Sequence, residues 1–216
     1  MKFQLYINFR YRIYDCSHVL ANQSTPSSVA PGQELVESVM IKESEMVYDW
    51  AWLSTTQEEG HENGEDLLLS TGRYQPIHLW NTQTGHLLES YKCFDQVDEV
   101  TSAYSICPLR EGQQRTGDAF VAGLKNEIRM FRLSRPGREY QSVAKNTKRD
   151  IGRLGIVSCL DYDLRSGLLA AGSYNKTVNI FHVEGGYLIH SFDGGHFGGI
   201  TQVCNYFCNV LCRYIS

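Results

Sequence analysis

Two of the seven histidines in the chain lie in the stretch TGRYQPIHLWNTQTGHLLES, residues 71–90, and could act as general bases. A histidine titrates near neutral pH and can take a proton when a nucleophile or a carboxylate lies within hydrogen-bond reach. His78 falls inside an alternating apolar run with Trp80, and His86 follows a Thr-Gly turn. Neither has such a partner nearby in the sequence, although a catalytic triad is assembled in space. We therefore interpret His78 as a structural histidine and His86 as exposed, and we predict no catalytic residue and no enzymatic activity.

A second candidate is the series Cys204, Cys208 and Cys212, whose four-residue spacing would place the thiols on one side of a helix. Zinc sites usually pair their cysteines two residues apart and need further ligands, so this spacing favours zinc only weakly. The alternative is that CNYFCNVLCRYIS, residues 204–216, is a tail acquired where the chain was truncated. We predict no metal site.

The stretch GGHFGGI, residues 194–200, could suggest a phosphate-binding loop around His196. A P-loop also needs a lysine and a Ser or Thr at its end, with a helix after them, and this stretch has no such pattern. The glycines instead allow a tight chain reversal around His196. We therefore expect no cofactor.

The formal net charge of −4 conceals an acidic block and a basic block. Residues 34–66 hold ten acids and one base, whereas residues 125–153 hold nine bases and three acids. Phosphates attract Lys and Arg, and RNA loop bases are commonly stacked on aromatic or guanidinium planes. The basic block offers both kinds of group, and the residues that we predict to contact RNA are Arg135, Arg138, Tyr140, Lys148 and Arg149. The alternatives are a solvated loop and edge strand for the basic block, and either a docking surface or an exposed loop for the acidic one.

Three segments of the chain repeat with a period near fifty residues. They are LLLSTGRYQPIHLWNTQTG, AFVAGLKNEIRMFRLSRPG and LLAAGSYNKTVNIFHVEGG, and their aromatic anchors Trp80, Phe131 and Phe181 are 51 and then 50 residues apart. The residues before each anchor alternate as in a strand, a turn follows, and a further strand precedes each segment. Four short antiparallel strands per repeat are typical of a β-propeller blade, which buries both faces against its neighbours. Arg129 and Arg132 fall on strand positions, where we expect them to pack or pair between blades.

The repeat therefore predicts an all-β, incomplete propeller with three full four-stranded blades and a partial blade at each end. The expected organisation is residues 1–45 as the end of a preceding blade with its connecting loop, 46–95, 96–150 and 151–194 as blades, and 195–216 as the first strand of a further blade with a divergent tail. Propellers usually have about four to eight blades, so we expect a truncated form whose open edges favour association.

Composition excludes several classes of protein. With 42% hydrophobic residues among 216, the chain can bury a sizeable core, and no apolar run approaches the length of a membrane span. The first residues, MKFQLYINFRYRIYDC, are broken by polar side chains before a signal-peptide core could form. Seven cysteines without a signal peptide favour a reducing cytosolic or nuclear compartment.

The aromatic-closed repeats and the Gly-His pair at His196 resemble the WD-repeat family, in which that histidine joins a buried hydrogen-bond network. The agreement is loose, because Asn81 follows Trp80 and the usual turn aspartate is replaced by Tyr74, Lys125 and Asn175. Residues 9–206 more closely resemble the telomerase Cajal body protein family, through peptides that occur in the same order and spacing: QPIHLWNTQTG, DEVTSAYSIC, SRPGRE, GIVSCL, AAGSYNKT and GGHFGGIT.

That resemblance implies an RNA-binding WD-repeat protein of the nucleus. Members of the family bind a short box in the terminal loop of small Cajal-body RNAs, and in many animals telomerase RNA, and direct the ribonucleoprotein to Cajal bodies. The implied partners are these RNAs, the proteins of their particles, telomerase, and other proteins at the propeller surface, with no membrane partner. The alternative is a WD-repeat protein–protein scaffold that binds no RNA.

Overall fold

The computed structural model describes residues 2–7, 10–15, 37–54, 66–95, 97–109, 119–137, 141–145, 154–193, 195, 197–206 and 209–214. Within these ranges all regular structure is β-strand, so the predicted all-β class is confirmed. The strands of the first half are β1 (Lys2–Ile7), β2 (Arg10–Asp15), β3 (Glu37–Lys42), β4 (Val47–Ser54), β5 (Asp66–Gly72), β6 (Ile77–Asn81), β7 (Leu87–Tyr91), β8 (Cys93–Phe94) and β9 (Val100–Thr101). Those of the second half are β10 (Ser105–Leu109), β11 (Ala119–Gly123), β12 (Glu127–Arg132), β13 (Gln141–Lys145), β14 (Val157–Asp163), β15 (Leu168–Ser173), β16 (Val178–His182), β17 (Tyr187–Phe192), β18 (Ile200–Tyr206) and β19 (Asn209–Tyr214).

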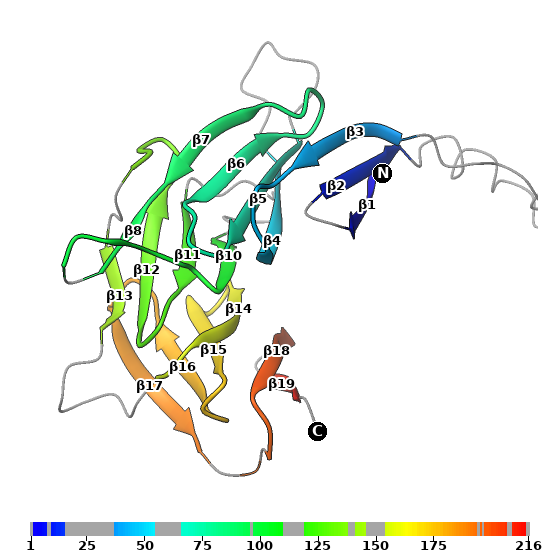
Figure 1. Cartoon of the computed structure of the whole chain (residues 1–216). Helices are drawn as coiled ribbons and strands as arrows, with labels where there is room; N and C mark the ends of the chain where they lie inside the picture. The colour runs from blue at the N-terminus through cyan, green and yellow to red at the C-terminus, as the bar shows by residue number, and fades with distance from the viewer. Residues whose placement is uncertain are drawn as a thin grey trace, which may run out of the picture.

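Three of the sheets have four strands in sequence order: β4–β5–β6–β7, β10–β11–β12–β13 and β14–β15–β16–β17. We call them the first, second and third blades, and Figure 1 shows them following one another from cyan to orange. All neighbouring strands within them are antiparallel. The prediction of three full four-stranded blades is therefore confirmed.

The periodic apolar positions are the ones that the blades bury. Ile77, Ile128 and Val178, which hold the same position in β6, β12 and β16, are each at most 1% exposed. The anchors Phe131 and Phe181 are fully buried, and Trp80 is 9% exposed. Burial of such side chains is the main driving force that stacks one blade on the next.

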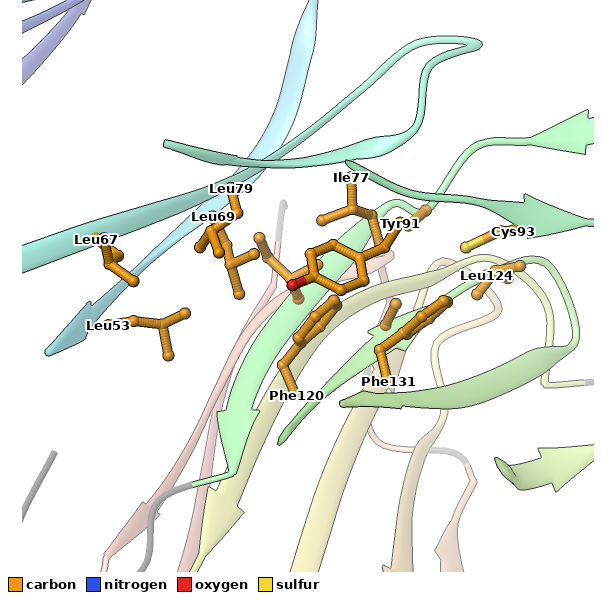
Figure 2. Packing of buried hydrophobic residues seen from close by; sticks show 13 residues of the cluster. Leu53, Leu67, Leu69, Ile77, Leu79, Tyr91, Cys93, Phe120, Leu124 and Phe131 are labelled. Atoms are coloured by element: carbon orange, nitrogen blue, oxygen red, sulfur yellow. The ribbon is translucent and has the colours of Figure 1, made fainter. Parts of the chain in front are cut away.

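The interface between the first and second blades is built around aromatic rings (Figure 2). Tyr91, at the end of β7, meets Phe120 edge to face with ring centroids 5.1 Å apart. Phe120 stacks on Phe131 at 5.1 Å with the two planes 10° apart. The Tyr91 hydroxyl donates a hydrogen bond to the Leu133 carbonyl at 2.8 Å. A side chain of one blade thus lies inside the core of the next, which a stacked repeat requires.

Sheets at the two ends of the chain flank the three blades. The sheet β1–β2–β3 packs Tyr11, Ile13 and Ile41 against Leu68 and Trp80 of the first blade. The strands predicted near residues 9–15 and 34–41 correspond to β2 and β3, and β1 is a strand that the sequence pattern did not predict.

The C-terminal segment corrects the helical interpretation of the cysteines. β18 and β19 form an antiparallel pair in which Val203 lies opposite Cys212 and Cys204 opposite Leu211. Cys208 lies outside the described residues. Residues four apart also lie on the same face of a strand, because every second side chain of a strand points to the same side. The β18 residues Ile200 and Val203 bury their side chains against the third blade. Residues 209–214 therefore form a strand that pairs with β18. From the sequence we predicted a divergent tail there instead of a second strand.

One predicted strand is interrupted. EVTSAYSIC, residues 99–107, gives β9, which pairs with β8, and then β10, which starts the second blade. Between them the Ala103 carbonyl accepts a hydrogen bond from the Thr71 hydroxyl at 2.7 Å. This bond to the first blade draws the backbone away from the regular ladder.

Candidate nucleic-acid interface

Arg135 lies in the turn between β12 and β13 and is exposed. Its backbone N–H donates to the Arg132 carbonyl at 3.1 Å, and Gly137 completes the turn with a φ of 113°, a conformation that favours glycine. The turn packs onto the edge of the first blade, where the Lys92 N–H donates to the Gly137 carbonyl at 2.6 Å. This anchoring holds Arg135 at the surface. The other four predicted RNA contacts, Arg138, Tyr140, Lys148 and Arg149, lie outside the described residues.

Arg129 has the packing role predicted for it. It is 8% exposed, its Nε donates to Glu127 Oε2 at 2.8 Å, and Nη1 donates to the Phe94 carbonyl at 2.6 Å. The guanidinium thereby ties β12 to the β8–β9 hairpin. Arg132, three residues on, is exposed, so it is not packed as Arg129 is, and its pairing between blades stays a prediction. Arg132 is the last residue of β12 and follows the buried residues of that strand.

A groove of about 840 Å³ lies between the second and third blades beside Arg132. Arg132, Arg165 and His182 contribute positive or hydrogen-bond-donating groups to its lining, and Glu184 contributes a carboxylate. The Gly185 N–H donates to His182 Nδ1 at 3.0 Å, so a neutral His182 carries its proton on Nε2. The groove begins at the end of β12, which leads directly into the Arg135 turn. Its lining thus combines Arg132 of the basic block and Arg165 with the carboxylate of Glu184.

His78 is held in a polar network at the junction of the first blade and the preceding sheet. Its Nδ1 lies 3.1 Å from Glu43 Oε2, and its ring meets Trp80 edge to face with centroids 5.6 Å apart. Trp80 Nε1 donates to Ser70 Oγ at 2.9 Å and to Glu43 Oε1 at 3.2 Å, and the Ser70 hydroxyl also donates to Glu43. His78 therefore has the structural role predicted for it. His86 is exposed, also as predicted.

Glu43 was not identified from the sequence as a structurally important residue. It belongs to the acidic block but is only 5% exposed. Burial raises the pKa of Glu43, but hydrogen bonds with His78 and Ser70 together with the charge of His78 outweigh it, so that the net pKa is lowered. The available signal was its place between two predicted strands, two residues after the buried Ile41 of β3 and before β4.

A half-buried acid, Asp49, joins the first and second blades. Asp49 on β4 accepts from the Ile106 N–H at 2.9 Å through Oδ2 and from the Trp50 N–H at 2.8 Å through Oδ1. Burial raises the pKa of Asp49 to about 6, against the two hydrogen bonds that lower it. Glu43 thus ties the preceding sheet to the first blade, and Asp49 ties the first blade to the second.

His196 of the Gly-His pair lies outside the described residues. Within the described ranges, no His, Cys, Asp and Glu side chains gather in a group that could hold a metal ion. The same part of the chain contains no helix long and apolar enough to cross a membrane.

Three stacked four-stranded antiparallel sheets, each closed on its third strand by a buried aromatic residue, define a WD-type β-propeller repeat protein. No protein-family model matches the chain. Curated relatives do match it, and over about nine-tenths of its length the chain is homologous to proteins named telomerase Cajal body protein 1.

Three relatives represent the range of these matches. The chain is 32% identical over 196 residues to telomerase Cajal body protein 1 of Rattus norvegicus, which covers 89% of this chain and 34% of the relative. It is 30% identical over 193 residues to the protein of the same name from Homo sapiens, covering 89% and 33%. It is 30% identical over 216 residues to the Drosophila melanogaster protein named telomerase Cajal body protein 1 homolog, covering 88% and 34%. The chain thus spans about a third of the length of these relatives.

Proposed function

We propose that this protein binds small Cajal-body RNAs, and telomerase RNA where it is present, and directs the ribonucleoprotein to Cajal bodies in the nucleus. The observation that carries the proposal is homology to curated proteins that are named for telomerase and the Cajal body. The exposed Arg135 turn, which leads from the groove containing Arg132 and Arg165, supports a surface for phosphates.

The proposed mechanism is non-covalent. Stacked blades form a rigid support, lysines and arginines contact RNA phosphates, and a few contacts to bases select the sequence. The residues assigned to RNA contact are Arg135, Arg138, Tyr140, Lys148 and Arg149. Since phosphates repel acids, Glu184 in the groove would favour positions nearer Arg132 and Arg135 for the RNA backbone. No bond is made or broken in this activity.

The partners follow from the same proposal. The RNA arrives as a particle, so the proteins of small Cajal-body ribonucleoproteins, and those of telomerase, would lie beside the propeller. Exposed blade edges are surfaces that such proteins could contact.

Crosslinking in cells tests the proposal directly. The 216-residue chain, carrying an affinity tag, is crosslinked to RNA, purified under denaturing conditions, and the attached RNA is sequenced. Strong enrichment of small Cajal-body RNAs is the expected result. Recovery of background RNA alone, with specific proteins still co-purifying under native conditions, would instead support a scaffold that binds no RNA.

A further inference from the structure

Four side chains gather where the first blade meets the second. Tyr48 lies on β4, Arg73 and Tyr74 lie in the β5–β6 turn, and Tyr104 directly precedes β10. The Tyr48 and Tyr104 ring centroids are 5.2 Å apart with planes tilted by 30°. The guanidinium carbon of Arg73 lies 5.0 Å from the centroid of the Tyr74 ring. We call these four residues the tyrosine cluster.

Hydrogen bonding joins the two halves of the tyrosine cluster into one surface. The Tyr74 N–H donates to Ser102 Oγ at 2.8 Å, and Ser102 is buried two residues before Tyr104. Burial raises the pKa of Tyr104, and the nearby Tyr48 and Tyr74 raise it further. The rings are nevertheless open to solvent, because Tyr74 is 73% exposed and Tyr48 is 39% exposed. Aromatic rings held in place but left uncovered are ready to receive a flat ligand.

Tyr74 occupies a backbone conformation that disfavours its own side chain. Its φ is 55°, in the left-handed region that L residues other than Gly, Asn and Asp rarely adopt. In the corresponding turns of the second and third blades the left-handed residues are Asn126, with a φ of 63°, and Lys176, with a φ of 68°. A bulky ring kept at a strained position on the surface points to a use for the ring.

Arg73 supplies the second half of the recognition chemistry. It is exposed and makes no ion pair within the part of the chain that the structure describes. The Tyr74 side chain and, more weakly, the charge of Glu45 raise the pKa of Arg73, yet the guanidinium stays exposed. Open rings beside an exposed guanidinium match a nucleotide, whose base stacks on the rings and whose phosphate pairs with the cation. A proline-rich peptide would use the rings without using the cation.

We propose that the tyrosine cluster stacks unpaired bases of the bound RNA, with Arg73 contacting an adjacent phosphate. This assignment rests on the proposed RNA-binding function and adds to it a base-contacting surface outside the basic block. Arg135 lies in the β12–β13 turn, whereas the cluster lies on the first blade and the start of the second. The two sets of residues can therefore be altered independently.

The test compares binding of two RNAs to the 216-residue chain by fluorescence anisotropy. One probe is a labelled terminal hairpin of a small Cajal-body RNA, and the other is the same stem without its loop. Tyr74→Asn removes the ring while suiting the positive φ, so the fold is retained. It is expected to weaken hairpin binding at least about fivefold and to leave stem binding nearly unchanged, because stacking needs unpaired bases. Arg73→Gln and Tyr48→Ala are expected to weaken hairpin binding as well.

Tyr174→Asn is the matched control, because Tyr174 is a tyrosine in the β15–β16 turn of the third blade that is 51% exposed and lies outside both the cluster and the groove. Its hairpin affinity should equal that of the unaltered chain. If the unaltered chain binds the hairpin and all three cluster variants bind it equally well, the base-stacking assignment is wrong, the proposed function stands, and the cluster is left to a protein partner. If the unaltered chain binds neither RNA, the proposed function fails and this assignment fails with it.

Discussion

Asp49 of the first blade accepts a hydrogen bond from the backbone N–H of Ile106 in the second blade at 2.9 Å. The bond crosses an interface whose core is apolar and which other hydrogen bonds also cross, such as that from Thr71 to Ala103, and the carboxyl is partly removed from water. Burial of a carboxylate disfavours its charged form, and it is this desolvation that raises the pKa of Asp49 to about 6.

The first prediction concerns pH. Because the pKa of Asp49 rises from 3.8 in the unfolded chain to about 6 in the folded one, the folded state binds more protons between these values. The contribution of Asp49 to stability should therefore fall as pH increases from about 4 to about 6, by on the order of 1–3 kcal/mol, and then level off. Urea unfolding at several pH values measures this slope, and Asp49→Asn should remove it. An unchanged slope in the variant would assign the pH dependence to another group.

The second prediction concerns the buried network of Glu43. Its lowered pKa means that its contribution to stability is present above the unfolded-state value of 4.5 and is lost as pH falls through the folded-state pKa. Glu43→Gln should lower the free energy of unfolding at pH 7 by about 1–3 kcal/mol, because charged hydrogen bonds with His78, Ser70 and Trp80 are weakened. Glu45→Gln, at an exposed neighbouring acid, should change it by less than about 0.5 kcal/mol. Equal effects of the two changes would show that the network adds no stability.

The third prediction concerns a repeat glycine. A Cβ on Gly123 would lie 2.4 Å from Ser105 Oγ and 2.6 Å from Val157 Cγ1, in the core between the second and third blades. Gly123→Ala should therefore destabilise the chain by about 1–3 kcal/mol through overpacking. Thermal or urea unfolding measures the loss. The double change Gly123→Ala with Val157→Ala makes room for the added methyl group, and an additive rather than compensating effect would contradict the packing explanation.

The fourth prediction concerns the basic block. Replacing Arg135, Arg138, Lys148 and Arg149 by Gln should reduce the slope of log affinity against log salt for RNA by up to about 3, because each phosphate contact contributes about 0.7–0.9. Binding measured from low to moderate salt gives the slope. Lys42→Gln with Lys176→Gln, at exposed lysines elsewhere, is the control. A slope that stays the same in the four-residue variant would remove the basic block from the RNA site.

The sequence predicted the blades because their signal is local and repeated. Ile77, Ile128 and Val178 are buried where strand alternation requires it, and the following aromatic anchors close the same strand in each blade. The spacing of the cysteines favoured a helix because residues four apart lie on one side of a helix. Only the pairing of β18 with β19, in which Cys204 lies opposite Leu211 and Val203 opposite Cys212, shows that these residues form strands.

The contacts of Glu43 and of the tyrosine cluster could not be predicted from local sequence patterns. Glu43 reads as one acid among ten, and its partners Ser70 and Trp80 are 27 and 37 residues away in sequence. Likewise Tyr48 and Tyr104 meet only because the first and second blades stack. Such contacts depend on how repeats are placed against each other, which spacing within one repeat does not report.

Tyr91 ends the outer strand of one repeat, yet its ring packs edge to face against the stacked rings of Phe120 and Phe131 of the next, and its hydroxyl bonds there to Leu133. The boundaries of the sequence repeat therefore differ from the boundaries of the unit that folds cooperatively. Excision of a single blade at its repeat boundaries would take away a ring that the following blade needs and leave two exposed faces. Evolution by duplication of such units would accordingly require that each new copy match its neighbours before it could add stability.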